Sequence, residues 1–425
     1  MEDILTNVCG LDVHKETVVA CIIKNKPTIG PVTDPSKATV TTEIRTYSTL
    51  YDDLQKLRLW LEAEKCHDIA MESTGIYWHP IYDVLETAYD GDVNLLVVNA
   101  RHMKNVPGKK TDVKDAEWIA TLLRAGLLRG SFIPPEEIRQ LRQLTRYRKT
   151  IVEDICAQKN RIEKFLQSSG YKLSNFLTDI FGVSGRSLIN ILINKGKITP
   201  RDVELELRGN AKHKIKDMRS ALNGVMNDHQ RQFLALQLEH LDSLISHQKK
   251  VEGDIDALSS QFSNEIDLLT TIPGIGQTAA KAIIAEIGVD MSRFPTADHF
   301  TKWAGLSPGD NESAGKKKST RITFGNTYVK GLICECAWCM VRSRNTYLSQ
   351  FYWRLKARRG AKKAIIAVAR KMLVIIYIML SNGVPYSEES FEKARKKQDD
   401  TRVRKIIKDA ARLGLVITQK EEDVA

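Results

Sequence analysis

The sequence has few cysteines, 7 among 425 residues, an odd number without regular spacing. This usage excludes a disulfide-stabilised scaffold and favours a reducing compartment. The densest group is Cys334, Cys336 and Cys339, in a stretch that we expect to be a buried helix, residues 329–340. A structural zinc site needs a second pair of cysteine or histidine residues nearby, and the sequence offers none there. We therefore expect no zinc at this position.

Long apolar runs are also missing. The longest, residues 372–380, is too short to span a bilayer and follows Arg370 and Lys371. Residues 1–6 contain neither a basic leader nor a long apolar stretch, so we expect no signal peptide. A cytoplasmic protein that does not act at a membrane is therefore the expectation.

The chain carries an excess of positive charge. Lysine and arginine number 64 against 52 aspartates and glutamates, which gives a formal net charge of +12. Such a balance favours polyanionic partners. The hydrophobic content of 42% is enough for two or three domains with real cores. One basic run is usually a solvated face, but here the excess gathers in four: residues 104–114, 316–321, 354–371 and 393–408.

Four carboxylates stand out by their positions. Asp12 and Glu72 each end a short apolar run that is typical of a buried strand. Asp112 and Asp115 lie three residues apart, which places both on one face of a helix. Four acids in one pocket repel each other unless a hard divalent cation with oxygen ligands joins them. On a basic chain the expected substrate of such a site is a phosphodiester, with Mg²⁺ as the metal and Mn²⁺ able to replace it.

The order of the expected elements in residues 1–130 is that of a ribonuclease-H-like α/β fold. In that fold, acids at the ends of the first and fourth strands meet acids of the last helix. Two metal ions held there can bridge a scissile phosphate, with Asp12 as the bridging ligand. His14 is expected to be a residue of the turn after the first strand. The expected strands are 8–13, 17–23, 38–47, 67–71 and 93–98, and the expected helices are 50–61, 77–89 and 114–125.

A basic segment precedes the last of these helices. Its cations would contact phosphates and so position a nucleic acid. Gly108, among them, would allow close backbone approach. The expected contact residues are Arg101, Lys104, Lys109 and Lys110.

Residues 131–265 are expected to be helical and highly charged. Apolar residues recur there at three-four spacing, as in Leu234, Leu238 and Leu241, which predicts two coiled-coil arms broken by a helical insertion at 170–209. Two interpretations stay open. The arms either form a helical core within one chain, or an antiparallel hairpin or coil that joins two chains.

Residues 266–390 are expected to form a mostly helical domain, followed by a basic tail at 391–425. The turn at 273–276, with Gly274 and Gly276, resembles a helix–hairpin–helix and leaves backbone N–H groups free to hold a phosphate. The polar loop at 306–321 contains two candidate nucleophiles, Ser313 and Ser319. The cations expected to hold a phosphate beside them are Lys316, Lys317, Lys318 and Arg321.

Several motifs together resemble one known family. They are the segments at 10–15, 71–78, 107–118, 122–128, 131–135, 272–276, 303–306, 313–316 and 325–326. These segments are similar to those of the DEDD transposases of the insertion-sequence-110 group. The resemblance covers nearly the whole chain except the middle insertion and the tail after about residue 390.

The resemblance implies a catalytic mechanism. The first domain would be similar to the RuvC Holliday-junction resolvase, with Asp12, Glu72, Asp112 and Asp115 as its four acids. Ser313 matches the serine that forms a phosphoserine bond with DNA. Where relatives often have Ser-Gly-Gly, this chain has Ser-Ala-Gly.

The resemblance also implies partners. A structured bridge RNA would pair with target and donor DNA, and recombination would pass through a Holliday-junction-like intermediate. Homodimers would assemble into a tetramer whose active sites join the acids of one protomer to the serine of another. The protein would work in a prokaryotic cytoplasm, at the nucleoid when active.

Three rival functions fit the sequence less well. A RuvC-like junction endonuclease that uses water needs only the first domain and leaves the loop of Ser313 unexplained. A non-catalytic nucleic-acid scaffold is disfavoured because all four acids are present. An actin-like ATPase of the same fold would need glycine-rich phosphate loops, and the turn at 13–16 contains no glycine.

Overall fold

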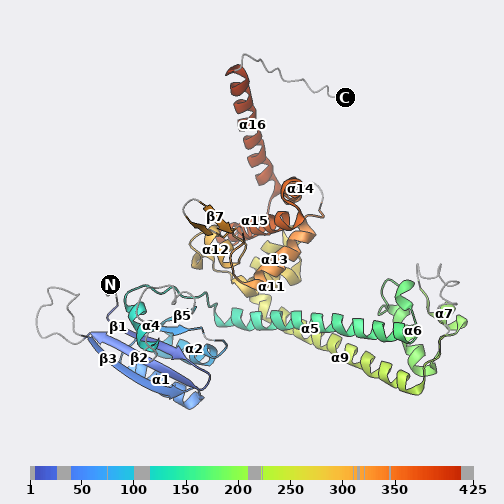
Figure 1. The fold of residues 1–425 in the computed structure, drawn as a ribbon, viewed down its shortest axis with the longest axis horizontal. Coiled ribbons are helices and arrows are strands. Elements are labelled where there is room, and N and C mark those ends of the chain that lie inside the picture. The colour runs from blue at the N-terminus through green and yellow to red at the C-terminus, as the bar shows by residue number, and fades with distance from the viewer. Residues whose placement is uncertain are drawn as a thin grey trace, which may run out of the picture. The chain divides into compact units, whose positions relative to one another are not determined.

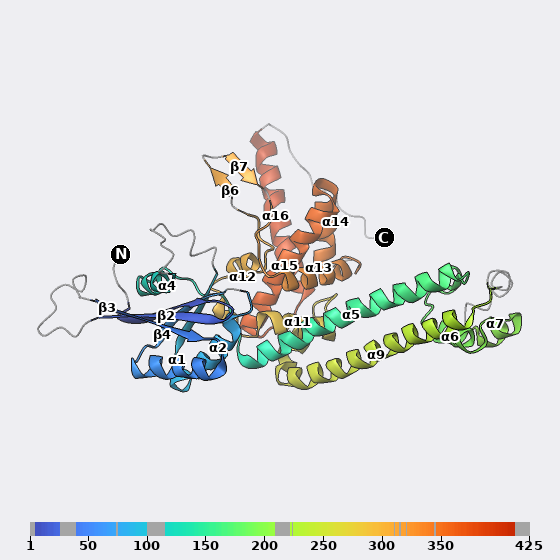
Figure 2. The ribbon, with the colours of Figure 1, turned by 60° about the horizontal axis from the view of Figure 1, so that its bottom comes forward.

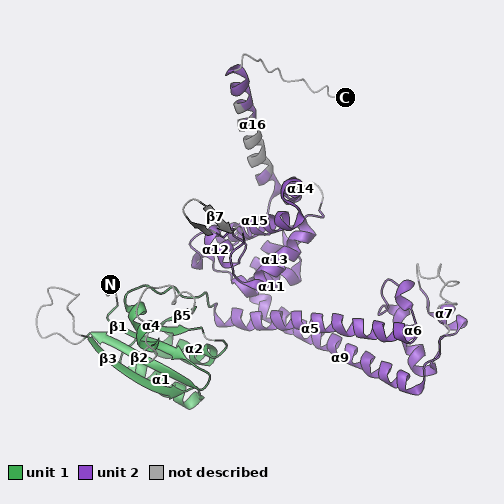
Figure 3. Ribbon diagram, in the orientation of Figure 1, with its two compact units in different colours: residues 1–133 green, residues 134–425 purple. Residues whose placement is uncertain are grey.

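The computed structural model describes residues 5–25, 40–73, 75–99, 115–208, 222, 224–309, 311–313, 316–319, 321–343 and 346–412. The chain divides into two compact units, unit 1 at 1–133 and unit 2 at 134–425 (Figure 3). Unit 1 is a mixed α/β unit, and unit 2 is mostly helical, so the expected fold classes are confirmed at this level.

Unit 1 is built on a five-stranded sheet in the order β3-β2-β1-β4-β5. β1 pairs antiparallel with β2 and parallel with β4, while β2–β3 is antiparallel and β4–β5 parallel. The strands form where β-branched and apolar residues recur, as in Thr17–Asn25. The bounds are β1 Asn7–Val13, β2 Thr17–Asn25, β3 Val40–Ser48, β4 Asp68–Glu72 and β5 Asn94–Val98.

Helices cover both faces of this sheet. Figure 2 shows α4, Asp115–Arg124, on one face, with α1, Tyr51–Ala63, and α2, Trp78–Glu86, on the other. Alternate residues of the strands fill the two cores, since side chains of a strand point to opposite faces. Leu11 and Met71 pack on the α1–α2 side, whereas Val8, Ala70 and Val98 pack on the α4 side. A short 3-10 helix, Ala88–Gly91, follows α2.

Unit 2 begins with two long helices that pack against each other, α5, Glu136–Ser168, and α9, Asp228–Ser259 (Figure 1). Their contacts run in opposite order along the chain: Arg148 pairs with Glu252, and the Gln158 amide donates to the Gln237 carbonyl at 3.0 Å. The two helices are therefore antiparallel within one chain. The far end of the pair carries α6, Val183–Lys195, and α7, Pro200–Glu206, after the short helix Leu173–Asn175.

The other end of unit 2 is a helical bundle around α15, Ala361–Asn382. Within the described residues, α15 is the one helix long and apolar enough to cross a membrane, with a mean hydropathy of 2.1. Half of that segment is buried inside the protein, and α15 packs on α12, α13 and α14 as a core helix. The remaining elements are α10 Ser263–Thr270, α11 Gln277–Ile287, α12 Ala297–Trp303, β6 Asn311–Ser313, β7 Lys316–Ser319, α13 Thr327–Met340, α14 Tyr347–Arg359, α16 Glu388–Arg412 and the 3-10 turns Ser260–Phe262 and Met291–Arg293.

Candidate active site

Asp12 and Glu72 lie side by side at the end of two parallel strands. Leu11 of β1 is in register with Met71 of β4, so the next step along both strands brings Asp12 beside Glu72. Leu11 and Met71 are buried on the α1–α2 side. By alternation, Asp12 and Glu72 face the α4 side.

Gly10 allows α4 to lie directly against β1. A Cβ atom on Gly10 would be 2.2 Å from the Ala116 carbonyl oxygen and 2.4 Å from the Ala120 nitrogen. Any other residue would push α4 away from the sheet. The sequence therefore places a glycine two residues before Asp12, where the helix must come closest.

The direction of α4 brings Asp115 to the same end of the sheet as Asp12. The Arg124 carbonyl, at the end of α4, accepts a hydrogen bond from the Leu5 N–H, just before β1 begins. The start of α4 therefore points toward the end of β1. Asp115 is the first residue of α4 and directly precedes Ala116, which touches Gly10. Asp12, Glu72 and Asp115 thus lie toward the same end of the β1–β4 pair.

The fourth acid, Asp112, lies outside the described residues. So do the expected phosphate contacts Arg101, Lys104, Lys109 and Lys110. Within the part of the chain that the structure describes, no three His, Cys, Asp or Glu side chains are close enough together to hold a metal ion. The chemistry of the acids still suits a hard cation, because carboxylate oxygens are its preferred ligands. The metal set therefore stays a prediction.

His14 contacts the first acid. Its Nε2 lies 3.2 Å from Asp12 Oδ2, and its side chain is 59% exposed against 17% for Asp12. The His14 backbone N–H donates to the Thr17 carbonyl at 2.9 Å, so the residue belongs to the β1–β2 turn as expected. The contact with Asp12 was not predicted. Its sequence signal is the spacing of two residues, which sets the turn residue His14 one residue past the end of the strand that carries Asp12.

Ser313 lies at the end of a short β-hairpin. β6 and β7 pair antiparallel, with Ser313 in register with Lys316 and Asn311 with Ser319. The two candidate serines therefore occupy different ends of the hairpin. Ser313 is the last residue of β6, whereas Ser319 pairs with Asn311, the first residue of β6, and so lies next to the stem. Lys317 pairs in register with Glu312, and Lys318 follows in β7.

The stem of the hairpin is held by backbone contacts. The Gly309 N–H donates to the Arg321 carbonyl at 2.8 Å, and the Thr323 N–H donates to the Ser307 carbonyl at 3.0 Å. Below them, Gly305 and Gly325 pack so closely that a Cβ on Gly325 would lie 2.3 Å from the Gly305 nitrogen. The hairpin thus leaves the body of unit 2 from a narrow, hydrogen-bonded base.

A buried carboxylate ties this base to α5. Glu286 is 3% exposed and accepts two hydrogen bonds from Arg146, at 2.6 and 2.9 Å. The Asn326 amide donates to the same carboxylate at 2.9 Å, while the Asn326 backbone N–H donates to the Trp303 carbonyl. Arg142 donates to the carbonyls of Ala285 and Glu286. Burial lowers the pKa of Arg142 to about 10, against the opposite effect of Glu286.

Two sequence models of transposases match this chain. The first, described as "Transposase" of the DEDD group, matches residues 9–170, and the second, "Transposase IS116/IS110/IS902 family", matches residues 266–353. The first contains Asp12, Glu72 and Asp115, and the second contains the Ser313 hairpin. In both regions the chain is similar to transposases of the IS110 family.

Several relatives carry names that agree with this family. A "Pilin gene-inverting protein" from Moraxella bovis is 30% identical over 31% of this chain and 42% of its own length. "Putative transposase y4qE" from Sinorhizobium fredii is 24% identical over 64% of this chain and 58% of its own length. "Transposase for insertion sequence element IS1111A" from Coxiella burnetii is 24% identical over 68% and 72%. The chain thus spans about half the length of the first two relatives.

The two glycines of the 273–276 turn have different surroundings. Gly274 has a φ of +90°, and a Cβ there would lie 2.8 Å from the Met340 nitrogen of α13. Gly274 is therefore needed for packing. Gly276 caps the start of α11 with open space around its Cα. A phosphate contact at this turn stays a prediction.

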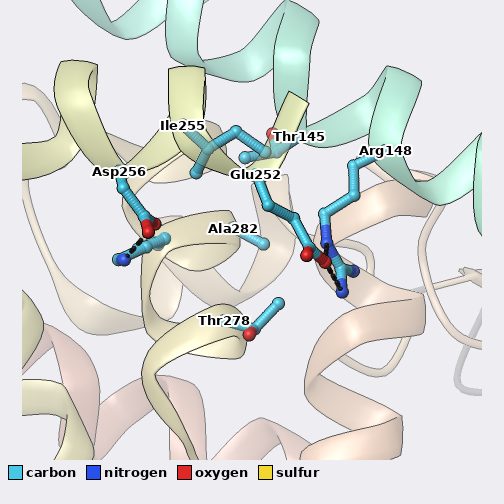
Figure 4. Close-up of a pocket in the computed structure, with 8 residues that line it drawn as sticks. Thr145, Arg148, Glu252, Ile255, Asp256, Thr278 and Ala282 are labelled. Atoms are coloured by element: carbon cyan, nitrogen blue, oxygen red, sulfur yellow. Dashed lines mark hydrogen bonds and ion pairs between the residues drawn. The ribbon is translucent and has the colours of Figure 1, made fainter. Parts of the chain in front are cut away.

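A polar cavity of about 250 Å³ lies where α5, α9 and α11 meet (Figure 4). Its charges are internally paired, Arg148 with Glu252 at 2.7 Å and Lys281 with Asp256 at 2.6 Å. No net charge remains among these four to attract a charged ligand. The cavity marks the junction between the two long helices and the bundle.

Proposed function

We propose that this chain is the transposase of an insertion sequence, which cuts and rejoins DNA with a metal-dependent acidic site and a nucleophilic serine. The observation that supports the proposal most is that Asp12, Glu72 and Asp115 lie toward the same end of the β1–β4 pair. The two transposase family models that match the chain support this class of reaction. The name of the pilin gene-inverting relative, which describes a rearrangement of DNA, supports it too.

These three acids, together with Asp112, are the proposed ligands of Mg²⁺. A bound Mg²⁺ would stabilise the negative charge that develops on the phosphate. The chain's own contribution would be position: the register of the paired strands sets Asp12 next to Glu72, and Gly10 lets the start of α4, which carries Asp115, lie close to β1. His14, 3.2 Å from Asp12, holds one of these carboxylates in place from the turn.

Ser313 is the proposed nucleophile. Its Oγ forms a bond to phosphorus while the bond from phosphorus to one deoxyribose oxygen breaks. The serine proton passes to a neighbouring base, and the departing oxygen takes up a proton. The phosphoserine linkage keeps the bond energy of the phosphodiester, so the strand can be rejoined. Lys316, Lys317, Lys318 and Arg321, close to Ser313 in the sequence, are the proposed phosphate contacts.

We further propose that a structured bridge RNA selects the DNA. Base pairing with target and donor strands would then read the sequence, and basic residues would hold the backbones. The proposed assembly is a homodimer that joins into a tetramer and resolves a Holliday-junction-like intermediate. The family resemblance of the motifs around Asp12, Glu72 and Ser313 supports these steps.

The experiment that tests this proposal looks for a covalent intermediate. Protein purified with its accompanying RNA is incubated with Mg²⁺ and end-labelled DNA that spans a boundary of the element, and the products are separated on a denaturing gel. Wild type should form a detergent-resistant protein–DNA adduct. Ser313→Ala should lose the adduct, and Ser319→Ala should keep it.

Three results would contradict the proposal. Cleavage without an adduct, unchanged in Ser313→Ala, would indicate a junction endonuclease that uses water. Binding of DNA with no cleavage at any Mg²⁺ or Mn²⁺ concentration would indicate a nucleic-acid scaffold. Loss of the adduct in Ser319→Ala alone would move the nucleophile to the stem end of the hairpin.

A further inference from the structure

The surface formed by α14 and the first turn of α15 is dense in positive charge. The sequence contains no aspartate or glutamate from residue 336 to residue 387. Within that stretch the exposed cations follow each other closely along the two helices. We call them, with Trp353, the α14 basic surface; the cations are Arg354, Lys356, Arg358, Arg359, Lys362 and Lys363.

None of these six cations forms an ion pair with an acid of the described residues. In the same stretch, Arg370 does have such a partner, Asp298, at 2.8 Å. Surface charges of one sign repel each other at these short separations, and their crowding disfavours the fold unless something compensates. A polyanion supplies the missing counter-charge.

Helix stability accounts for only part of this charge. Lys356, Arg358 and Arg359 lie in the last turn of α14, where the helix dipole favours cations. Lys362 and Lys363 lie in the first turn of α15, where the same dipole disfavours them. Cations at the unfavourable end of a helix point to binding rather than to folding as the reason for their presence.

An exposed tryptophan lies within the same surface. Trp353 is 55% exposed, and the Lys356 ammonium lies 4.3 Å from the centre of its ring. A large aromatic ring left in water gives up hydrophobic stabilisation that burial would provide. Among charges of one sign, such a ring offers a π face on which an unpaired base stacks, with cations beside it for the adjoining phosphate.

We infer that the α14 basic surface binds single-stranded DNA. Duplex DNA would satisfy the cations but not the tryptophan, because its bases are already stacked and paired. This inference rests on the proposed function, since cutting and exchanging strands releases single strands that must be held. An anionic membrane surface would also attract the cations, and the experiment below distinguishes it.

The first test removes the stacking ring. Binding of the full chain to a fluorescent oligothymidine strand, and to a duplex of equal length, is measured by anisotropy. Trp353→Ala should weaken binding to the single strand by about 5- to 100-fold, the range for loss of one stacking aromatic, and leave duplex binding nearly unchanged. Tyr51→Ala, which removes a ring that is 68% exposed on α1, serves as the control and should change neither.

The second test removes charge. The triple variant Arg354→Gln, Arg358→Gln, Lys362→Gln is compared with Lys164→Gln, Lys249→Gln, Lys250→Gln, which loses the same charge from exposed positions on α5 and α9. The first triple should reduce the magnitude of the slope of log affinity against log salt by about 2, because each of the three lost phosphate contacts with a single strand contributes roughly 0.7. The second triple should leave that slope unchanged.

Three results would overturn the inference. The first is an unchanged single-strand affinity in Trp353→Ala. The second is an equal reduction of the salt slope in the two triple variants. The third is that the first triple variant loses binding to phosphatidylserine vesicles but keeps its binding to DNA. The Ser313 adduct is assayed on the same proteins. A missing adduct in wild type, together with Trp353-dependent single-strand binding, would refute the proposed function and leave this inference standing.

Discussion

At the residue scale, the candidate active site depends on a glycine as much as on its acids. Gly10 has no side chain to separate β1 from α4, and the helix backbone occupies the space that a Cβ would fill. Asp115 reaches the end of β1 because of this contact. The acids carry the proposed chemistry, and Gly10 lets the two elements that hold them lie close together.

We therefore predict that Gly10→Ala destabilises unit 1. The added methyl group would overlap the Ala116 carbonyl and force α4 outward, at a cost of about 2 kcal/mol or more. Urea unfolding measures this loss. Gly253→Ala is the matched control: nothing lies within 4 Å of that position on α9, and alanine in a helix should stabilise it by about 0.5–1 kcal/mol. Equal stability of Gly10→Ala and wild type would contradict the close packing.

At the element scale, the Ser313 hairpin depends on helices that are distant in sequence. Its base is tied through Asn326 to Glu286 on α11, and through Glu286 to Arg146 on α5. The carboxylate is buried, so removing its charge leaves the Arg146 guanidinium without its partner, and it also removes the charge that lies 3.6 Å from Arg142 Nε. A buried pair that loses one member costs far more than an exposed pair.

Glu286→Gln should accordingly destabilise unit 2 by about 3 kcal/mol or more. Glu252→Gln is the control, because it breaks the ion pair between Glu252 of α9 and Arg148 of α5, in which the carboxylate is 38% exposed. This loss should cost under about 1 kcal/mol. Thermal unfolding compares the two. In the adduct assay, Asn326→Ala should reduce the yield of protein–DNA adduct more than it reduces the affinity for DNA. The variant keeps every residue of the hairpin but loses the hydrogen bond from Asn326 to Glu286 that holds the base of the hairpin. Equal costs for the two glutamate variants would refute the special role of Glu286.

The capping box of α7 gives a prediction about pH. Hydrogen bonds from Lys195 and from Thr199 lower the pKa of Asp202 from 3.8 to about 2. Because the folded-state pKa lies below the unfolded one, the contribution of Asp202 to stability is complete above the unfolded pKa. It is lost as the pH falls through the folded pKa.

Asp202→Asn should therefore unfold at a lower temperature than wild type at neutral pH, and at the same temperature once the pH is below the folded-state pKa. Scans of thermal unfolding against pH check this. Asp228→Asn, at a side chain that is 88% exposed, serves as the control. A difference between Asp202→Asn and wild type that persists unchanged in strong acid would contradict the assigned cause.

At the scale of the whole molecule, sequence patterns predicted elements better than contacts between them. The sheet of unit 1 follows alternation and β-branched residues, which act locally, so β4 at 68–72 and α4 at 115–124 lie within a residue or two of their predicted bounds. The Glu286 contacts were not predicted, because Arg146 and Asn326 are separated from it by 140 and 40 residues. No local pattern carries that information.

The long helices show the same limit. Three-four spacing predicted two arms but left open whether they pair within one chain, and the Arg148–Glu252 contact identifies an antiparallel pair within it. The contact of His14 with Asp12 was also missed, because an exposed turn histidine is usually without a partner. The predicted roles of Asp112, Ser313 and the basic residues around them remain to be measured.

The central claim is that Asp12, Glu72 and Asp115 act together as a metal-dependent site for DNA cleavage, and one measurement tests it most directly. Cleavage of end-labelled boundary DNA is followed in saturating Mg²⁺ for wild type, Asp12→Ala, Asp115→Ala and Asp52→Ala. Asp52→Ala is the control for charge, at an exposed acid on α1, on the opposite face of the sheet. The account predicts that both site variants bind DNA but do not cleave it, while Asp52→Ala cleaves as wild type does. Cleavage by Asp12→Ala at the wild-type rate would contradict it.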